Sequence, residues 1–496
     1  MIPKGSFPRI ICLLALIGSV ADAVARQLPP QPPALAVELS GSSPQQSSDN
    51  EDSEDEDSTT EDLEKRLQEI EADWNEFQES QEKKETESAR KPTFEIGGRV
   101  HLDYWSFPQA SDGIGYFEHP DPSDPAYGTD PENRFLFRRV RIEAQGEIPD
   151  RMFWRLQVDF NTPSEPQMKD VYLGWYLPGN RKLLVGNSKR PLGLDAWNSS
   201  RFNVFMERPL AVAAFNPNAR RLGVRMEAYR DDLTMSWQYG FFGLEDVQET
   251  GEIEGDSFQP SLFGRLATTP WYDETSGGRG YWHFGIAGSV ARPDGDVADA
   301  DSNGNPARFR TRPQARTDGR WADTRTIRGA ETFEQLGLET VVNIGAVQVV
   351  SEYLTTWVQR DETTPGTGPN TFFHGGYVQV SYFLTGEHMP WDRETGQLDR
   401  IHPFENFFLV ERCRGGQGGG WGAWQVAARY DYLDLTNEDI RGGVQNDLTL
   451  GLNWWWNPYA RVQFNVTRGF IDQHRNVGGF ESGDFWLMGT RFAANF

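Results

Sequence analysis

Hydrophobic and polar residues alternate along most of the chain after Lys91. The last twelve residues, 485–496, show this most clearly: counted back in twos from Phe496, one face is apolar and aromatic and the other is small or polar. A period of two is that of a β-strand with one apolar face. Because chain ends usually fray unless a sheet holds them, this end predicts a strand that closes a sheet. Taken alone, it would equally suit a half-buried edge strand of a soluble sandwich.

The same period predicts sixteen strands in total. They lie near residues 94–105, 135–146, 152–161, 170–177, 182–187, 222–229, 233–242, 263–269, 281–290, 332–344, 347–358, 372–385, 422–434, 447–457, 460–467 and 485–496. The number is even, and many of the strands have the roughly 9–11 residues that a tilted membrane strand needs.

The connections favour a membrane barrel over a sandwich. Every second one is short, at residues 148–150, 178–181, 230–232, 345–346 and 457–459. The others are long, at residues 107–134, 188–221, 243–262, 291–331, 359–371 and 468–484. Short turns at one end and long loops at the other are typical of outer-membrane barrels. Residues 386–421 break the rule, so either an unrecognised hairpin or a segment packed as a plug is predicted there.

Composition supports the same fold. Hydrophobic residues make up only 37% of the 496 residues, yet 13% are aromatic, with 17 Trp and 31 Phe. A membrane barrel exposes every second residue to lipid and carries aromatic girdles at both interfaces. After the first 25 residues, no apolar run is long enough for a transmembrane helix. We therefore predict an all-β fold, a 16-stranded antiparallel transmembrane β-barrel, over residues 91–496.

Two segments at the N-terminus are predicted to lie outside any folded domain. Residues 1–25 have a basic start, a short apolar core and small residues at 23–25, which predict a cleaved signal peptide rather than a membrane anchor. Residues 26–60 are rich in Pro, Gln and Ser and then acidic, which predicts a disordered arm. Cleavage would leave Cys413 as the single cysteine, so an internal disulfide is excluded.

Residues 61–90 are predicted to form a short periplasmic helix. Its apolar residues are spaced 4, 3, 4 and 3 apart, as in a heptad seam: Leu63, Leu67, Ile70, Trp74 and Phe77. The seam is short for an independent coiled coil. The alternatives are a coiled coil between chains held together elsewhere and a single amphipathic helix on a surface. A periplasmic or cell-wall partner would suit either.

Enzyme motifs are sparse. The seven histidines show no metal-ligand spacing, no serine lies in a nucleophile elbow, and Gly415–Gly420 is predicted to be a flexible turn. We predict neither enzymatic activity nor a cofactor. The net charge of −25 disfavours nucleic-acid binding. Residues 38–90 hold 19 acids and 5 bases, more than half of that imbalance, so the acidity says little about the barrel.

Basic residues gather in one long connection of this acidic chain. Between Lys189 and Arg225 there are seven bases and only two acids. A loop of this length can fold into the lumen, where clustered bases would attract anions. On strand 135–146, Arg139 and Arg141 share the polar face and would line the pore wall. The alternative is that these arginines only balance luminal acids. A second basic run, residues 308–328, would form a vestibule or a solvated face.

Several stretches resemble one family. They are FRRVRIEAQGEI (137–148), LQVDF and KDVYLGW (156–160, 169–175), VGNSKRPLGLD (185–195), NARRLGVRMEA (218–228), YFLTGE (382–387), GAWQVAARYDYLDL (422–435) and DLTLGLNWWWNPYARVQFNV (447–466). Together they are similar to the phosphate-selective porin O and P family of bacterial outer-membrane channels. The resemblance implies a sixteen-stranded barrel, a homotrimer, and an anion path lined by arginine and lysine. It also implies that segment 386–421 is normal for the family.

The residues that match the family-like stretches are the candidates for the anion path. They are Arg139, Arg141, Lys189, Arg190, Arg220, Arg221 and Arg225. Lysine is scarce in the predicted barrel, and the acidic arm and helix lie outside the resemblance, so passage of small anions is favoured over strict phosphate selectivity. The alternatives are a structural barrel that anchors the envelope through its periplasmic helix and a general non-selective porin.

Overall fold

The computed structural model describes residues 91–496, apart from 163, 249–257, 294–306, 362, 364–365 and 412–415, together with Lys65 and Trp74. The chain divides into two units, Met1–Gln81 and Glu82–Phe496. The predicted signal peptide and acidic arm, and all of the predicted helix 61–90 except Lys65 and Trp74, lie outside the described residues. Within the described part, no helix is long and apolar enough to cross a membrane.

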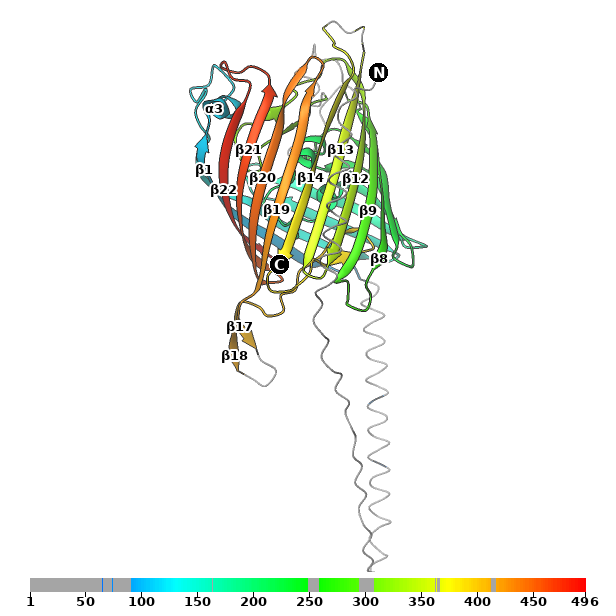
Figure 1. The fold of residues 1–496 in the computed structure, drawn as a ribbon. Helices are drawn as coiled ribbons and strands as arrows, with labels where there is room; N and C mark the ends of the chain where they lie inside the picture. The colour runs from blue at the N-terminus through cyan, green and yellow to red at the C-terminus, as the bar shows by residue number, and fades with distance from the viewer. Residues whose placement is uncertain are drawn as a thin grey trace, which may run out of the picture. The chain divides into compact units, whose positions relative to one another are not determined.

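Sixteen strands of the described chain form a closed barrel (Figure 1). They are β1 (Glu95–Ala110), β2 (Arg134–Ile148), β3 (Met152–Asp159), β4 (Gln167–Leu177), β5 (Arg181–Lys189), β6 (Arg220–Tyr229), β7 (Met235–Gly243), β8 (Pro260–Tyr272), β9 (Gly280–Ala291), β12 (Ala330–Ile344), β13 (Val347–Arg360), β14 (Thr371–Phe383), β19 (Ala423–Asn437), β20 (Ile440–Asn457), β21 (Ala460–His474) and β22 (Gly483–Asn495). Each pairs antiparallel with its neighbours in this order, and β22 pairs with β1, so that Arg99 lies opposite Asn495. The predicted barrel, and its closure by the C-terminal strand, are confirmed.

The alternation seen in the sequence sorts side chains between lipid and lumen. On β22, Trp486, Met488 and Phe492 are exposed on the outside of the barrel, whereas Leu487 and Arg491 are buried inside it. Successive side chains of a strand point to opposite faces, so the outer positions bear the apolar surface that a bilayer requires. The apolar face predicted for the C-terminal segment is therefore the lipid face.

All sixteen predicted strands are present, with small differences at their ends. The two largest are at β20, which begins at Ile440 rather than near residue 447, and at β21, which ends at His474 rather than near residue 467. The connection from β19 to β20, at the long-loop end, is therefore only residues 438–439. Residues 440–446 are polar and glycine-containing, which in sequence indicates a loop, but the strand pair continues through a register shift near Asp434. Backbone pairing tolerates polar side chains there because both faces can contact water or polar loops.

Three segments fold into the lumen. The constriction loop, residues 190–219, carries α4 (Leu194–Trp197) and α5 (Leu210–Phe215). The arginine loop, residues 307–329, carries β10 (Arg310–Thr311) and β11 (Ala322–Asp323). Both come from the long-loop end, as does the short helix α3 (Asp112–Glu118) after β1. The third segment, from the short-turn end, is the inner hairpin of β15 (Trp391–Asp392) and β16 (Gln397–Leu398).

Segment 386–421 contains two hairpins with different surroundings. The inner hairpin packs in the lumen: the Trp391 ring lies 5.4 Å from that of Tyr281 on β9. The outer hairpin, β17 (Phe408–Glu411) and β18 (Gln417–Gly420), projects beyond the end of the barrel (Figure 1). Both alternatives raised by the sequence, an unrecognised hairpin and a plug, therefore hold.

Candidate functional site

The constriction loop crosses the lumen and is fastened to strands on several sides. Glu352 on β13 accepts hydrogen bonds from the backbone N–H groups of Leu194 and Asp195, at 2.6 and 2.8 Å. Asn453 on β20 donates to the Val204 carbonyl at 2.9 Å. Arg491 on β22 donates to the carbonyl of Met206. Because these strands lie around much of the barrel, the loop narrows the lumen.

One side of the lumen is filled by apolar packing. The buried apolar residues of the constriction loop, among them Phe205, Leu210 and Phe215, join one hydrophobic cluster with inward residues of β7 to β20. The cavity left between this loop and β13, β14 and β19 is about 10 Å³, bounded in part by Phe205 and Tyr377. That is about the volume of a single water probe, so this cavity is too small to hold an anion.

The opposite side of the lumen is lined by arginine, and we call it the arginine wall. It has eight arginines and four carboxylates: Arg99, Arg138, Arg139, Arg141, Arg155, Arg201, Arg461 and Arg491, with Asp103, Glu143, Asp159 and Glu207. Six of the arginines come from β1, β2, β3 and β22, one from β21, and Arg201 from the constriction loop. The wall therefore carries an excess of positive charge.

Each carboxylate of the wall pairs with arginine, and three of the four, Asp103, Glu143 and Glu207, are shared by several arginines or bound through both oxygens. Glu207 accepts from Arg138 through two oxygens at 2.7 and 3.0 Å and also from Arg491 at 3.0 Å. Arg491 in turn binds Asp103 through both oxygens at 2.7 Å. Burial alone would raise the pKa of Glu207, but the charges of Arg138 and Arg491 outweigh it and hold that pKa well below its usual range. Glu207 thus stays ionised.

A β-bulge places two consecutive arginines in the lumen. In the β1–β2 pair, His101 lies opposite Arg139 and Leu102 opposite Phe137, so Arg138 is an extra residue. Strict alternation would turn Arg138 toward lipid. The bulge instead lets Arg138 reach Glu207 while Arg139 lies beside His101, with its Nη1 at 3.3 Å from the ring Nδ1.

Five arginines of the wall and one histidine keep N–H groups without a partner among the described residues, and the three most buried of these arginines are Arg99, Arg139 and Arg461. Arg139 has no carboxylate partner, and its Nε has no acceptor among the described residues. Arg461 makes one bond, of 3.4 Å to the Ser200 carbonyl, and its Nε and Nη1 lack acceptors in the same part of the chain. The Nε of Arg99 is also unpartnered. These side chains are almost wholly buried.

His101 completes this group. The positive charges of Arg491, Arg139, Arg99 and Arg461 all act on its ring, and the Nη1 of Arg139 lies 3.3 Å from its Nδ1. Because Arg139 can only donate, the Nδ1 of His101 must accept and the ring proton lies on Nε2. That Nε2–H is unpartnered among the described residues. Buried donors without acceptors are costly, and an anion or water between them would satisfy them together.

The predicted candidates on β2 and β6 have different partners. Arg141 binds Asp159 at 2.7 Å, and Arg225 binds Glu227 at 2.6 Å. Arg220 chelates Asp170 at 2.7 and 2.8 Å. Arg221 lies 3.5 Å from Asp246 and donates to three backbone carbonyls. Of the candidates on these two strands, Arg139 is thus the one whose charge no carboxylate compensates in the described chain.

The two candidates at the end of β5 hold the constriction loop. Lys189 Nζ donates to the carbonyls of Trp197 and Asn198 at 2.6 and 2.9 Å. Arg190 donates to Asn216 at 2.9 Å, and its guanidinium lies 5.0 Å from the centre of the Phe263 ring. Both residues therefore fix the position of the loop, and neither has a carboxylate partner in the described chain.

The arginine loop carries cations of its own. Gln314 from this loop accepts from Arg429 and Thr449 at 2.6 and 2.7 Å, which docks the loop onto β19 and β20. Burial, with repulsion by neighbouring arginines, lowers the pKa of Arg312, of Arg316 and of Arg320 to about 10 each. All three remain charged near neutral pH, and Arg312 and Arg316 lie close enough to Arg138 of the arginine wall to interact with its charge.

Sequence reasoning missed several residues of the wall. Arg99 and Arg461 lie on the polar faces of their strands, in GGRVHLD and ARVQFNV, so the alternation was the available signal. Arg201 and Glu207 lie in the constriction loop, where no periodicity shows which way a side chain points. Their roles depend on where the loop crosses the barrel.

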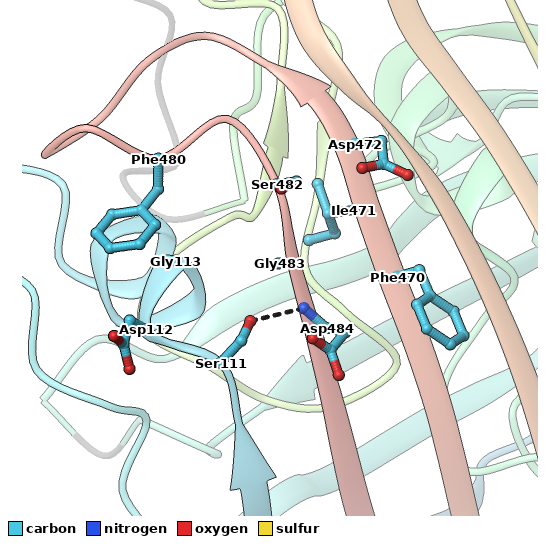
Figure 2. Close-up of a pocket in the computed structure, with 10 residues that line it drawn as sticks. All are labelled: Ser111, Asp112, Gly113, Phe470, Ile471, Asp472, Phe480, Ser482, Gly483 and Asp484. Carbon is cyan, nitrogen blue, oxygen red and sulfur yellow. Dashed lines mark hydrogen bonds between the residues drawn. The ribbon is translucent and has the colours of Figure 1, made fainter.

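A separate hollow lies at the long-loop rim (Figure 2). It has a volume of about 490 Å³ between the end of β1, the start of α3 and the adjoining ends of β21 and β22. Asp112, Asp472 and Asp484 line it, and the Asp484 backbone N–H donates to Ser111 Oγ at 2.8 Å. Its acidic lining disfavours anions, so it does not extend the arginine wall.

Comparisons with known proteins agree with this architecture. A family model described as phosphate-selective porin O and P matches residues 121–490. Porin O of Pseudomonas aeruginosa is 24% identical over 433 residues, covering 81% of this chain and 88% of that protein. An uncharacterized protein of Caulobacter vibrioides is 28% identical over 340 residues, covering 68% of this chain but only 62% of that protein.

Two solved structures are similar in fold. An anion-selective porin from Comamonas acidovorans has a TM-score of 0.46 at 12% identity, covering 82% of this chain and all (100%) of that chain. The trimer form of OmpT, an outer membrane protein of Vibrio cholerae, has a TM-score of 0.47 at 10% identity, covering 82% of this chain and 99% of that chain.

The closed barrel, the lipid-facing outer surface and the loop-narrowed lumen define an outer-membrane β-barrel of the porin class. The chain belongs to the phosphate-selective porin O and P family, so the resemblance found in the sequence is confirmed. Its location is the bacterial outer membrane. Family and fold are those of porins, which are channels rather than enzymes, and the prediction that the chain is not an enzyme is confirmed.

Proposed function

We propose that this porin is a passive channel for small anions, with inorganic phosphate among them, and that the anions move along the arginine wall. The observation that carries the proposal is the group around His101: unpartnered N–H donors on Arg99, Arg139, Arg461 and His101, buried together beside the lumen. Such a group favours an anion over a cation both by charge and by hydrogen bonding.

Phosphate suits this group for chemical reasons. Its oxygens accept several hydrogen bonds at once, and guanidinium donors bind phosphate in pairs. The family's description and the relative named Porin O support the same choice of ion. The carboxylates of the wall limit the net attraction, and ions that bind weakly can leave as readily as they arrive. A lysine ladder is absent from the described wall, so we propose general small-anion passage with phosphate as one substrate.

The seven candidates divide into two roles under this proposal. Arg139 and Arg141 lie on the wall and contact the passing anion, together with Arg99 and Arg461. Lys189, Arg190, Arg220, Arg221 and Arg225 set the position of the constriction loop and of β6. A homotrimer is also proposed, from the family resemblance and from the heptad spacing in residues 61–90.

The test is a reversal potential in a planar bilayer under a salt gradient. With potassium chloride, we expect anion preference, and Arg139→Gln and Arg461→Gln should each weaken it. Arg230→Gln is the matched control, because this arginine lies in the β6–β7 turn, half-exposed, and pairs with Asp232 at 2.8 Å. Cation preference in the protein without substitutions would contradict the proposal. The protein would then be a general porin whose arginines only balance acids.

A second candidate, a structural barrel without a continuous path, is favoured by one observation. The inner hairpin and the constriction loop meet inside the lumen, where the Leu398 N–H donates to Asn198 Oδ1 at 3.0 Å. Segments from both ends therefore touch. Absence of any conductance would support the structural role, with residues 61–90 as the link to the cell wall or a partner.

A further inference from the structure

The outer hairpin carries aromatic side chains that nothing in the described chain covers. Trp421 is 77% exposed, Phe404 66% and Phe408 64%. Trp421 follows β18, Phe408 begins β17, and Phe404 lies in the chain that leads into the hairpin. Rings this exposed on one small element are unusual in water and indicate a surface that contacts something apolar.

The base of the hairpin is joined to the lipid-facing aromatic girdle. Trp454 and Trp456 face outward, since Trp455 between them is buried on the inner side. The Phe407 ring lies 4.5 Å from that of Trp454, and the Phe407 N–H donates to the Trp456 carbonyl at 2.6 Å. Trp456 in turn contacts Phe492 on the outer face of β22 at 5.5 Å. The exposed rings therefore extend the girdle beyond the barrel end.

Hydrogen bonds fix this arrangement. The indole N–H groups of Trp424 and Trp454, whose rings stack at 5.0 Å, both donate to the Trp421 carbonyl, at 3.2 and 2.9 Å. Two hydrogen bonds fix the backbone of Trp421, while its side chain stays exposed. The exposed position of the ring is therefore set by the fold. Trp at such a level is typical of membrane interfaces, where an apolar ring and a polar edge meet headgroups.

Two cations accompany the rings at the same end of the barrel. Arg279 lies 6.0 Å from the centre of the Phe404 ring and donates to the Gly386 carbonyl at 2.8 Å. Arg400 lies 4.5 Å from the Tyr459 ring and donates to the Pro458 carbonyl at 2.8 Å. Neither forms an ion pair with a carboxylate in the described residues. Guanidinium groups next to interfacial rings match the phosphates of lipid headgroups.

We propose that the outer hairpin contacts the glycerophospholipids of the periplasmic leaflet. Phe404, Phe408 and Trp421 contact the region between headgroups and acyl chains, and Arg279 and Arg400 contact headgroup phosphates. Short turns lie on the periplasmic side of such barrels, which assigns the leaflet. Continuity with the girdle is the reason for choosing lipid over a second copy of the chain or a periplasmic protein.

The test uses a nitroxide label on the full chain in vesicles of phosphatidylethanolamine and phosphatidylglycerol. Cys12 and Cys413 are replaced by serine, and the label is placed by Trp421→Cys or, separately, Phe408→Cys. The matched control is Asp231→Cys, exposed in the β6–β7 turn at the same end. Both hairpin side chains are largely exposed and the hydrogen bonds to Trp421 use its backbone, so these variants keep the fold.

Oxygen partitions into the bilayer, whereas a nickel chelate stays in water. We expect labels at 421 and 408 to collide readily with oxygen and poorly with nickel, with a ratio several-fold above that at 231. Labels as open to nickel as the control would place the hairpin in water and overturn the proposal. Labels shielded from both reagents would also overturn it, because a protein surface, such as a second copy, would then cover the rings.

Discussion

Arg139→Gln tests whether anion binding depends on arginines of the wall that have no carboxylate partner. Arg139 is buried, lacks a carboxylate partner and has an unpartnered Nε in the described chain. Glutamine removes the charge and keeps a polar, though shorter, side chain. Its neighbour Arg138 differs in one respect, because Glu207 compensates its charge. The two positions therefore make a matched comparison.

The magnitude follows from the local geometry. A unit charge about 4 Å from an anion contributes roughly 4 kcal/mol at an effective dielectric constant of about 20. Desolvation offsets part of this, and hydrogen bonds to charged groups retain about 1.5–3 kcal/mol. At about 1.4 kcal/mol per tenfold change, removal of Arg139 should weaken phosphate binding by roughly ten- to one-hundred-fold.

The assay is block of chloride current by added phosphate in single-channel recordings. We expect Arg139→Gln to raise the half-blocking phosphate concentration by that factor. The double variant Arg138→Gln/Glu207→Gln removes one positive and one negative charge, and Arg491 keeps Asp103 as a partner. Its half-blocking concentration should change little. A large effect in the double variant and none in Arg139→Gln would refute the argument that uncompensated charge sets anion binding.

Three further predictions concern the plug, the wall and the arginine loop. Trp391→Ala should loosen the inner hairpin, because it removes the ring that packs against Tyr281 and His283 and a bond to Thr269; loss of a buried Trp costs about 3–5 kcal/mol, and single-channel conductance should rise, so unchanged conductance would count against a plug. Arg491→Leu should lower the free energy of unfolding in lipid by about 3–5 kcal/mol, since it leaves the buried Asp103 unpaired; urea titration measures this, and a neutral result would contradict the pairing. The pKa of about 10 for Arg312, Arg316 and Arg320 means that their charge is present below that pH and is lost as the pH rises through it, so anion preference should fall there, and the triple glutamine variant should show a flatter pH profile.

The connections between strands were harder to predict from the sequence than the strands themselves. Segment 386–421 was the connection that broke the predicted alternation of short turns and long loops. The structure shows two hairpins there, one packed inside the barrel and one outside it. Trp391 and Trp421 belong to the same segment, yet one is buried against Tyr281 and the other is exposed. Their local sequences do not differ in a way that indicates this, because the choice depends on which strands lie within reach.

In the candidate site, too, some features were predictable from the sequence and others depended on the tertiary structure. Alternation identified Arg139 and Arg141 as inward residues of β2, because side-chain direction in a strand depends on the backbone alone. It did not identify the bulge that turns Arg138 inward, since a bulge depends on the register with β1. Arg141 and Arg225 pair with Asp159 and Glu227, which is the arrangement expected if arginines balance luminal acids.

The sequence by itself determined the class of fold, the sixteen strands and the lipid-facing side of each. These properties follow from a period of two and from the spacing of polar connections, both of which are local along the chain. The tertiary structure decided which positive charges remain uncompensated. Arg491 pairs with Asp103, at the other end of the barrel sequence, and Arg138 pairs with Glu207 from a loop that crosses the lumen. Electrostatic interaction depends on distance through space, and the folded barrel alone fixes those distances.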